Sequence, residues 1–132
     1  MATIFTKIIQ GAIPSYKVAE DERFFAFLDI APLAAGHTLV VPKFAPDGEA
    51  DYIFDLDDET LSAMMVFAKR VAGRIREVTG CARVAVVVLG LEVPHVHIHL
   101  IPIDSESDVD FRRPRLSLSP SEFEALVGRL AF

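Results

Sequence analysis

The stretch His95-Val96-His97-Ile98-His99-Leu100-Ile101 begins with a strict alternation of imidazoles and aliphatic side chains. Successive side chains of a β-strand point to opposite faces of a sheet, so this period of two predicts a strand. The aliphatic residues then face a core, and the three histidines form one row on the other face. A slip of one residue would bury all three imidazoles and expose the aliphatic side chains, so the pattern also fixes the register of the strand.

Other short runs of branched and aromatic residues, separated by turn signals, predict further strands. We expect strands over residues 17–20, 24–30, 38–41, 83–89 and 93–103. The last two are separated by little more than Gly90-Leu91-Glu92, which predicts a hairpin. Together these runs indicate a mainly antiparallel sheet.

Two segments have a period between three and four, which is that of an α-helix. The longer one begins after Asp57, a suitable N-cap, spans about 20 residues and ends at Gly80. The shorter one starts at residues 119–122, where Ser-Pro-Ser-Glu combines an N-cap, an N1 proline and a capping-box glutamate. The apolar stripe of the longer helix consists of Leu61, Met64, Met65, Ala68, Val71, Ala72, Ile75 and Val78. The expected fold is α+β: a mainly antiparallel sheet of about five strands, one long helix and short terminal helices.

Size and composition limit the number of domains and the class of partner. A chain of 132 residues, 52% of them hydrophobic, is sufficient for one core, so we expect a single domain over residues 1–132. The net charge of −6 argues against general affinity for nucleic acid or an acidic membrane surface and favours a small substrate. The longest apolar run, residues 84–89, is too short to span a bilayer, and the single cysteine, Cys81, fits a reducing cytoplasmic environment.

A row of imidazoles can bind a transition metal, donate hydrogen bonds to an anion or attack an electrophile. A strand spaces alternate side chains by about 6.6 Å, so three of them converge on one metal ion only with help from elsewhere. His37, the fourth histidine, is the residue that could supply it. Half-buried structural histidines are the simplest alternative, but three of the four at strict alternation argue against that interpretation.

Nucleophilic catalysis explains the arrangement best. An imidazole is partly unprotonated near neutral pH, so it can attack phosphorus to give a phosphohistidine that water then cleaves. Neighbouring imidazoles can donate hydrogen bonds to the phosphate oxygens and protonate the leaving group. One row of side chains can therefore hold the nucleophile, the acid and the anion-binding groups.

The alternating run matches the His-φ-His-φ-His-φ-φ signature of the histidine triad (HIT) family. Three further segments resemble that family in the same order, namely residues 4–9 with Ile13-Pro14, residues 26–32 and residues 36–43. The resemblance covers roughly residues 2–104 and leaves residues 105–132 as a C-terminal extension. It points to the HINT-like branch, whose members resemble nucleotide-binding phosphoramidases.

The resemblance implies hydrolysis or transfer at the α-phosphorus of a purine nucleotide such as AMP or GMP, and dimerisation by joining two sheets. It implies that His97 becomes nucleotidylated. His95 and His99 are then expected to contact phosphate oxygens and the leaving group, with His37 in support. Asp29 is expected to accept hydrogen bonds from the ribose hydroxyls. The residues expected to enclose the base are Phe5, Ile8, Phe27, Ile30 and Leu39. We expect no cofactor and assign no residue to a metal.

The sequence departs from the family pattern where polar residues usually contact phosphate. Residues 86–89 are Val-Val-Val-Leu in a strand that often holds an asparagine, and Leu91 stands where a glutamine is usual. Leucine cannot replace the hydrogen bonds of an amide, and Glu92 adds a negative charge next to an anion site. The alternatives are a nucleotide-binding module with weak or lost catalysis and a metal-binding regulatory protein.

The cluster Arg112-Arg113-Pro114-Arg115 lies in the C-terminal extension, outside the matched region. One interpretation is a solvated basic segment. The other is a segment that reaches the distal phosphate or the leaving group of a substrate, either in its own chain or across a dimer.

Overall fold

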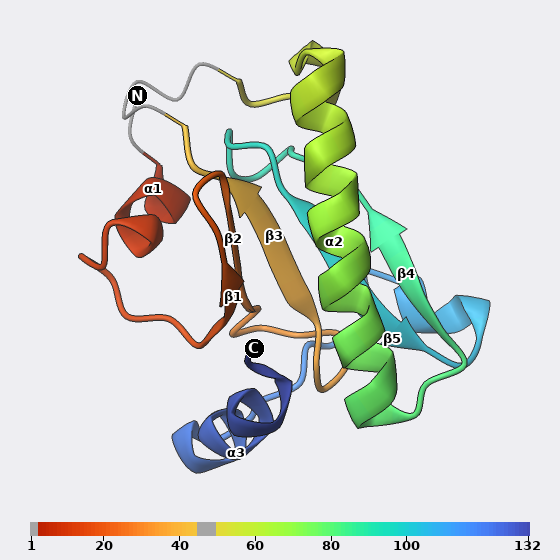
Figure 1. Cartoon of the computed structure of the whole chain (residues 1–132). Coiled ribbons are helices and arrows are strands. Elements are labelled where there is room, and N and C mark those ends of the chain that lie inside the picture. Colours follow the sequence, from red (N-terminus) through yellow and green to blue (C-terminus); the bar gives the residue numbers. More distant parts are fainter. Residues whose placement is uncertain (1–2, 45–49) are drawn as a thin grey trace.

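A five-stranded sheet in the order β1-β2-β3-β5-β4 forms the centre of the computed structural model (Figure 1). Its strands are β1 (Lys17–Glu20), β2 (Phe24–Leu28), β3 (Thr38–Pro42), β4 (Arg83–Val87) and β5 (Ile98–Ile103). Each neighbouring pair is antiparallel. The structure describes residues 3–44 and 50–132, so the expected domain over residues 1–132 includes residues outside the described part, and its bounds stay a prediction.

The helices within the described residues are α1 (Ile4–Ile9), η1 (Ile53–Asp55), α2 (Asp58–Thr79), η2 (Glu106–Val109) and α3 (Pro120–Leu130), of which η1 and η2 are 3₁₀ helices. Helix α2 ends at Gly80, whose φ of 70° lies in the left-handed region that glycine adopts without strain. Ser119 and Glu122 form the capping box that begins α3. The α+β prediction and both predicted helices are confirmed. No helix in this part of the chain is long and apolar enough to cross a membrane.

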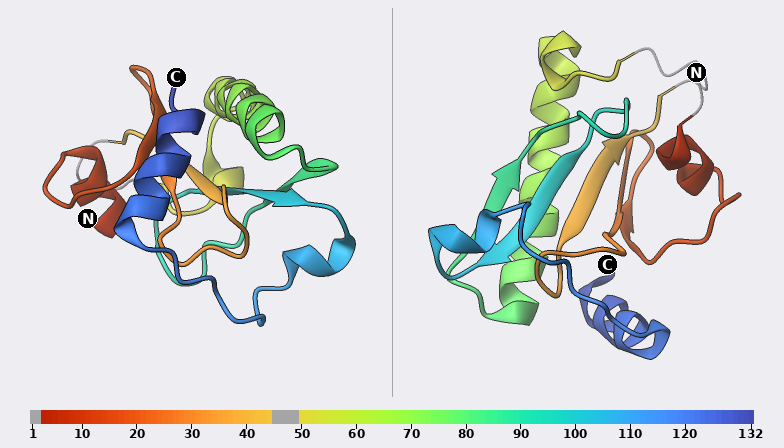
Figure 2. Two further views of the ribbon diagram at one scale, coloured as in Figure 1. Left: turned by 90° about the horizontal axis from the view of Figure 1, so that it is seen from below. Right: turned by 180° about the vertical axis from the view of Figure 1, so that it is seen from behind.

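Helix α2 lies across one face of the sheet (Figure 1 and Figure 2). It buries Met64, Phe67, Ala68, Val71 and Ile75, whereas Met65 of the predicted stripe is 41% exposed. The alternating run contributes Val96, Ile98 and Leu100 to the same core. Full burial of an aliphatic side chain of this size contributes about 1.5–3 kcal/mol, so this packing decides which side of the run meets the helix. The histidines therefore face away from α2.

A smaller apolar cluster lies on the face of the sheet that turns away from α2. Phe25 pairs with Val41, and Phe27 pairs with Leu39, across β2 and β3. Helix α1 adds Phe5, whose ring centroid lies 5.6 Å from that of Phe27. Helix α1 thus packs over the β2 and β3 part of this face, while β5 and the residues just before it present the histidines beside it.

The predicted strand over residues 93–103 is wrong in its first five residues, because β5 begins only at Ile98. Pro94 has no N–H to donate, and the N–H of His95 donates to the carbonyl of Val93 at 2.8 Å, which closes a three-residue turn. Residues 88–97 therefore form a longer connection than the predicted hairpin turn. The alternation of core-facing and site-facing side chains still holds, because Val96 is buried in the core although it lies before β5.

Two other predicted strands are each two residues too long. Strand β2 ends at Leu28, before Asp29 and Ile30, and β4 ends at Val87, before Val88 and Leu89. At the first of these ends, Asp29 Oδ1 accepts the N–H of Ala31 at 2.9 Å. This local turn takes the chain away from the sheet.

The C-terminal extension follows β5 through η2 and returns across the molecule to α3 (Figure 2). The N–H of Leu116 donates to the carbonyl of Pro32 at 2.8 Å, and the ring of Phe123 stacks on that of Tyr16. The extension therefore packs against the rest of the fold and reaches the segment that follows β2.

Candidate active site

Three of the four histidines come together where β3 and β5 lie side by side. His37 precedes β3, His97 precedes β5, and His99 lies within β5. The ring centroids of His97 and His99 are 5.0 Å apart, and those of His37 and His99 are 5.2 Å apart. All three rings are buried. The structure therefore brings His37, His97 and His99 together, and the roles expected for them from the sequence stay predictions.

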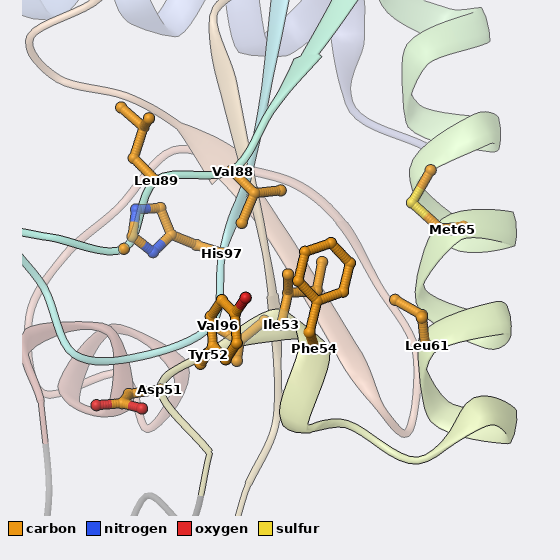
Figure 3. A pocket seen from close by; sticks show the side chains of 11 residues that line it. Asp51, Tyr52, Ile53, Phe54, Leu61, Met65, Val88, Leu89, Val96 and His97 are labelled. Atoms are coloured by element: carbon orange, nitrogen blue, oxygen red, sulfur yellow. The ribbon is translucent and has the colours of Figure 1, made fainter.

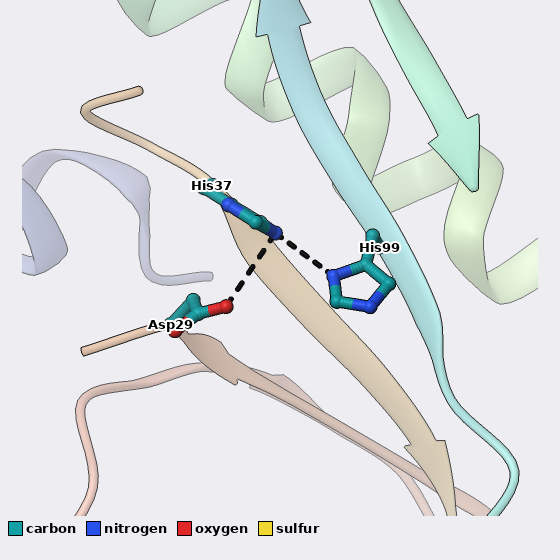
Figure 4. Close-up of side chains that lie close together, drawn as sticks. All are labelled: Asp29, His37 and His99. Atoms are coloured by element: carbon teal, nitrogen blue, oxygen red, sulfur yellow. Dashed lines mark hydrogen bonds and ion pairs between the residues drawn. The ribbon is translucent and has the colours of Figure 1, made fainter. Parts of the chain in front are cut away.

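Backbone and side-chain hydrogen bonds fix the tautomers of His37 and His99. The N–H of Leu33 donates to Nδ1 of His37 at 3.0 Å, so this nitrogen carries a lone pair and the proton of the neutral ring sits on Nε2. Nε2 of His37 in turn lies 3.0 Å from Nδ1 of His99, which therefore accepts (Figure 4). The proton of neutral His99 is thus on Nε2, which has no hydrogen-bond partner among the described residues.

Burial keeps both of these rings neutral. It lowers the pKa of His37 to about 3, with smaller contributions from the neighbouring His99 and Arg115. Burial likewise lowers the pKa of His99 to about 4, with His97 and Arg115 contributing. At neutral pH His37 is a hydrogen-bond donor that holds His99, and His99 directs its own N–H away from His37.

His97 has the opposite tautomer. Its Nδ1 lies 2.7 Å from the carbonyl oxygen of His95, and because a carbonyl can only accept, the proton sits on Nδ1. Nε2 of His97 therefore carries the lone pair, and the described residues offer it no hydrogen bond. Burial lowers the pKa of His97 below its ordinary value, so the ring is neutral near pH 7. The ring of Phe5 packs against it in an edge-to-face arrangement, at 5.0 Å between centroids.

His95 is held by the protein at both ring nitrogens. Nε2 donates to the carbonyl of Pro42 at 3.1 Å, which leaves Nδ1 to accept from the hydroxyl of Thr3 at 2.9 Å. The ring also packs against Phe5 and Phe44. Of the three alternating histidines, His95 is the one that joins α1, the end of β3 and the loop before β5. This geometry favours a positioning role for His95 over direct contact with a substrate.

Asp29 lies beside the His37–His99 pair. Its Oδ2 is 3.6 Å from Nε2 of His37, and its side chain is 15% exposed (Figure 4). Burial raises the pKa of this carboxyl group, an effect that the N–H of Ala31 and the charge of Arg115 oppose. Asp29 therefore offers acceptor oxygens at the rim of the histidine cluster.

The residues expected to enclose a base do not all lie together. Phe5, Phe27 and Leu39 are buried in the cluster under α1, with Ile8 packed against it. Ile30 is 72% exposed, and it follows the turn that ends β2. The structure thus brings four of the five together and leaves Ile30 in solvent, next to Asp29.

A cavity of about 390 Å³ opens on another side of His97. Figure 3 shows α2 on one side and the segment after β4 on the other, with His97 at the edge. Tyr52, Phe54, Leu61, Met65, Val88 and Leu89 are among the lining side chains, and His97 is the one predicted site residue among them. The sequence signal was the apolar pair Val88 and Leu89 just after the end of β4, and a strand prediction alone does not place these residues at a site.

Leu91, which stands where the family pattern has a glutamine, is 91% exposed. Gly90 before it has a φ of 72°, in the left-handed region, and the loop turns the Leu91 side chain into solvent. Leu91 therefore makes no contact with the histidines in this conformation.

Asp29, His37 and His99 are the described residues whose donor atoms lie close enough to hold a metal, all within 4.8 Å of one another. A neutral histidine ligates a metal through one nitrogen and keeps its proton on the other. The N–H of Leu33, however, donates to Nδ1 of His37 and therefore keeps the proton on Nε2, the nitrogen that faces the cluster. The donor set has suitable spacing, but the tautomer of His37 opposes a metal.

Three contacts of the site had no sequence signal. They are the backbone N–H of Leu33, the backbone carbonyl of Pro42 and the ring of Phe111, whose centroid lies 5.0 Å from that of His99. The first two are backbone groups, which the residue type does not reveal. Phe111 lies in the C-terminal extension, twelve residues after His99, so local pattern does not predict their contact.

An antiparallel sheet, covered on one face by a long helix and bearing a buried imidazole cluster on the other, defines a class of small α+β proteins with a histidine-based site. The profile of the HIT domain matches residues 10–106, and the chain belongs to the HIT domain family. The sequence-based recognition is therefore confirmed.

Relatives and solved structures agree with this assignment. An adenosine 5'-monophosphoramidase from Schizosaccharomyces pombe is 36% identical over 132 aligned positions, which cover 96% of this chain and 93% of the relative. A Hit-like protein from Bartonella henselae has a TM-score of 0.79 at 28% identity, covering 97% of this chain and 93% of that chain. A zinc-bound histidine triad protein from Mycobacterium smegmatis has a TM-score of 0.76 at 28% identity, covering 96% and 91%.

Proposed function

We propose that this protein is a nucleotide hydrolase or transferase that acts at the α-phosphorus of a purine nucleoside phosphoramidate or a related nucleotide, through a nucleotidyl-His97 intermediate. The observation that carries the proposal is the hydrogen bond of 2.7 Å between His97 Nδ1 and the carbonyl of His95. It orients the ring and leaves the lone pair of Nε2 for attack. The similarity to the adenosine 5'-monophosphoramidase supports the class of substrate.

In the first step Nε2 of His97 attacks phosphorus, so that an N–P bond forms while the bond to the leaving group breaks. The N–H at Nε2 of His99 donates to the phosphate, and the negative charge of the phosphate raises the pKa of His99 from its low value in the free protein. His99 takes a second proton from solvent on Nδ1 and, once protonated, gives its Nε2 proton to a leaving amine. In the second step water attacks phosphorus, the bond to His97 breaks, and Nε2 of His99 takes up the proton of the water. When the nucleotide leaves, His99 returns its Nδ1 proton to solvent.

His37 and Asp29 accommodate the extra proton. While His99 carries it, Nδ1 of His99 no longer accepts from His37. The Nε2 proton of His37 then needs another acceptor, and Oδ2 of Asp29 lies 3.6 Å away. In this proposal His37 is a positioning residue, and Asp29 also accepts from the ribose hydroxyls of an AMP- or GMP-like ligand. Phe5, Ile8, Phe27 and Leu39 provide the apolar wall for the base.

The protein is also proposed to form a homodimer through its β4 edge. Strand β4 ends the sheet order and pairs only with β5 in the described chain, so its outer edge has unpaired backbone groups. Large apolar side chains nearby are exposed, among them Val86, Val88, Met65 and Val66. A second copy would cover this patch and the adjoining cavity. A soluble cytoplasmic location remains the expectation from the sequence.

A trapping experiment tests the mechanism. The protein is mixed with adenosine 5'-phosphoramidate, quenched within one turnover and digested, and mass spectrometry locates the adenylyl group. We expect it on His97, with no adduct and no turnover in His97→Ala. Full turnover by His97→Ala would contradict the mechanism through a nucleotidyl-His97 intermediate.

The alternative of a binding module with weak or lost catalysis rests on Leu91, which points into solvent where the family pattern has a glutamine. It predicts AMP binding by calorimetry without an adduct or product formation in the same samples. Turnover of the phosphoramidate would exclude it.

A further inference from the structure

The three arginines of the C-terminal extension have different surroundings. Arg112 pairs with Asp110 at 3.0 Å and is almost fully exposed, and Arg113 pairs with Asp108 at 3.4 Å. Arg115 forms no ion pair with any carboxylate in the described residues; its single side-chain hydrogen bond there goes to the carbonyl of Ala31 at 2.6 Å. Two of the three charges are thus neutralised within their own segment, and that of Arg115 is not.

The segment of residues 110–116, which we call the strap, holds Arg115 next to the histidine cluster. The ring of Phe111 meets the ring of His99 at 5.0 Å, in an edge-to-face arrangement. The guanidinium carbon of Arg115 lies 5.2 Å from the centroid of that same Phe111 ring. Phe111 therefore separates Arg115 from His99 by one aromatic ring and provides a cation–π platform for it.

Two hydrogen bonds tie the strap to the turn after β2, which presents Asp29. The N–H of Leu116 donates to Pro32, and Arg115 donates to Ala31, whose own N–H binds Oδ1 of Asp29. The position of Arg115 is consequently fixed relative to Asp29 as well as to His99. A guanidinium has five N–H donors, and the described residues use one of those of Arg115. The others are available at an exposed position.

We propose that Arg115 is an anion-binding residue of the histidine site and contacts a phosphate group of the bound nucleotide. This inference rests on the proposed function, because it takes the ligand to be a nucleotide. A planar guanidinium binds phosphate oxygens through two parallel N–H bonds, which a lone imidazole N–H cannot do. Arg115 would supply a polar phosphate contact in a protein whose Leu91 supplies none. The phosphate is the α-phosphate, a phosphate of the leaving group or one on the ribose.

Calorimetric titration with four ligands tests the proposal and distinguishes these sources. The ligands are adenosine, AMP, α,β-methylene-ADP and adenosine 3',5'-bisphosphate. Arg115→Gln is compared with wild type, with Arg115→Lys and with Arg112→Gln, a matched control whose charge is already paired. A charge-assisted bond of ordinary strength predicts a loss of about ten-fold or more in affinity for Arg115→Gln. Arg115→Lys should recover part of it, and Arg112→Gln should bind like wild type.

The pattern across ligands identifies the phosphate. A loss for all three phosphorylated ligands, with adenosine unchanged, assigns the contact to the α-phosphate. A loss confined to α,β-methylene-ADP assigns it to the leaving group, and one confined to the bisphosphate assigns it to the ribose.

Two results overturn the proposal. One is an unchanged affinity of Arg115→Gln for every phosphorylated ligand; the other is an equal loss for adenosine, which would mean that the strap acts only through structure. If AMP binds in either case, nucleotide binding stands without Arg115. If no ligand binds to wild type, the proposed function fails together with the inference.

Discussion

The carbonyl oxygen of His95 lies 2.7 Å from Nδ1 of His97, so one histidine of the alternating run orients the next through its backbone. The side chain of His95 is held in turn by Pro42 and Thr3. A nucleophile positioned by a backbone carbonyl keeps its lone pair on Nε2 whatever the side chain of the supporting residue does. This relationship separates the roles of the two residues and leads to a first prediction.

His95→Ala should reduce stability more than it reduces catalysis. The variant leaves the carbonyl of Pro42 and the hydroxyl of Thr3 without their partner, which costs about 1–3 kcal/mol of unfolding free energy. We expect kcat/KM for adenosine 5'-phosphoramidate to fall by less than about ten-fold, because the backbone carbonyl that orients His97 remains. Urea unfolding and steady-state kinetics give the two numbers. His95→Asn, which retains a donor, should be intermediate in stability. A loss of activity as complete as that of His97→Ala would instead place His95 on the substrate.

The free energy of unfolding should fall as the pH decreases below about 6.5. Burial lowers the pKa of His37 to about 3 and that of His99 to about 4, from an ordinary value of 6.5. Between these values the unfolded chain binds more protons than the folded chain. The stability contributed by the two neutral histidines is therefore complete above the pKa of the unfolded chain, and it is lost as the pH falls towards the pKa values of the folded protein. Each histidine contributes a slope of about 1.4 kcal/mol per pH unit in that window. Urea unfolding between pH 7.5 and pH 5 at fixed ionic strength, about 0.1 M, measures it. His37→Gln should have a shallower slope, and an unchanged slope would contradict the assignment.

Zinc should not bind tightly at the Asp29, His37 and His99 cluster. The N–H of Leu33 keeps the proton of His37 on the nitrogen that a metal would need. We expect equilibrium dialysis of the chelator-treated protein against zinc to give well below one equivalent bound. His99→Gln, which removes a member of the cluster, is the matched control and should bind no less. One equivalent in wild type that is lost in His99→Gln would support the metal-binding alternative.

A lysine at Val86 should weaken the proposed dimer. Val86 lies on the edge strand β4 and is 50% exposed, and a charged residue on an edge opposes strand pairing between copies. We expect light scattering coupled to size exclusion to show a dimer for wild type and a monomer for Val86→Lys. Ile4→Lys is a matched control, because Ile4 is equally exposed but lies on α1. A monomeric wild-type protein, or a dimer that tolerates Val86→Lys, would exclude this interface.

The sequence was sufficient for the faces of the sheet and for the helix ends. Alternation placed Val96, Ile98 and Leu100 in the core and the histidines opposite, because a period of two has only one way to bury its aliphatic half. Gly80 ended α2 as predicted, because few other residues accept a φ of 70°. These features depend on the hydrophobicity and the backbone preferences of single residues, which the sequence gives directly.

Other features depend on contacts between distant segments, which local pattern does not contain. The turn at Pro94 shortened β5 without disturbing the alternation, so the pattern of polar and apolar residues could not reveal it. Phe111 reaches His99 only because the extension returns to the turn after β2. Ile30 looked like a pocket residue by resemblance but lies in solvent, because Asp29 ends the strand before it.

The hydrogen bond from Leu33 to His37 has a consequence for mutagenesis. The donor is a peptide N–H, so replacing the Leu33 side chain with alanine or valine leaves the bond in place, and a conventional alanine scan would report the position as one of packing alone. Only a residue without that N–H, which means proline, or a backbone ester introduced by chemical synthesis removes it. The main chain between Asp29 and His37 thus determines which ring nitrogens of the histidine cluster carry protons, and substitution of side chains in this segment leaves that unchanged.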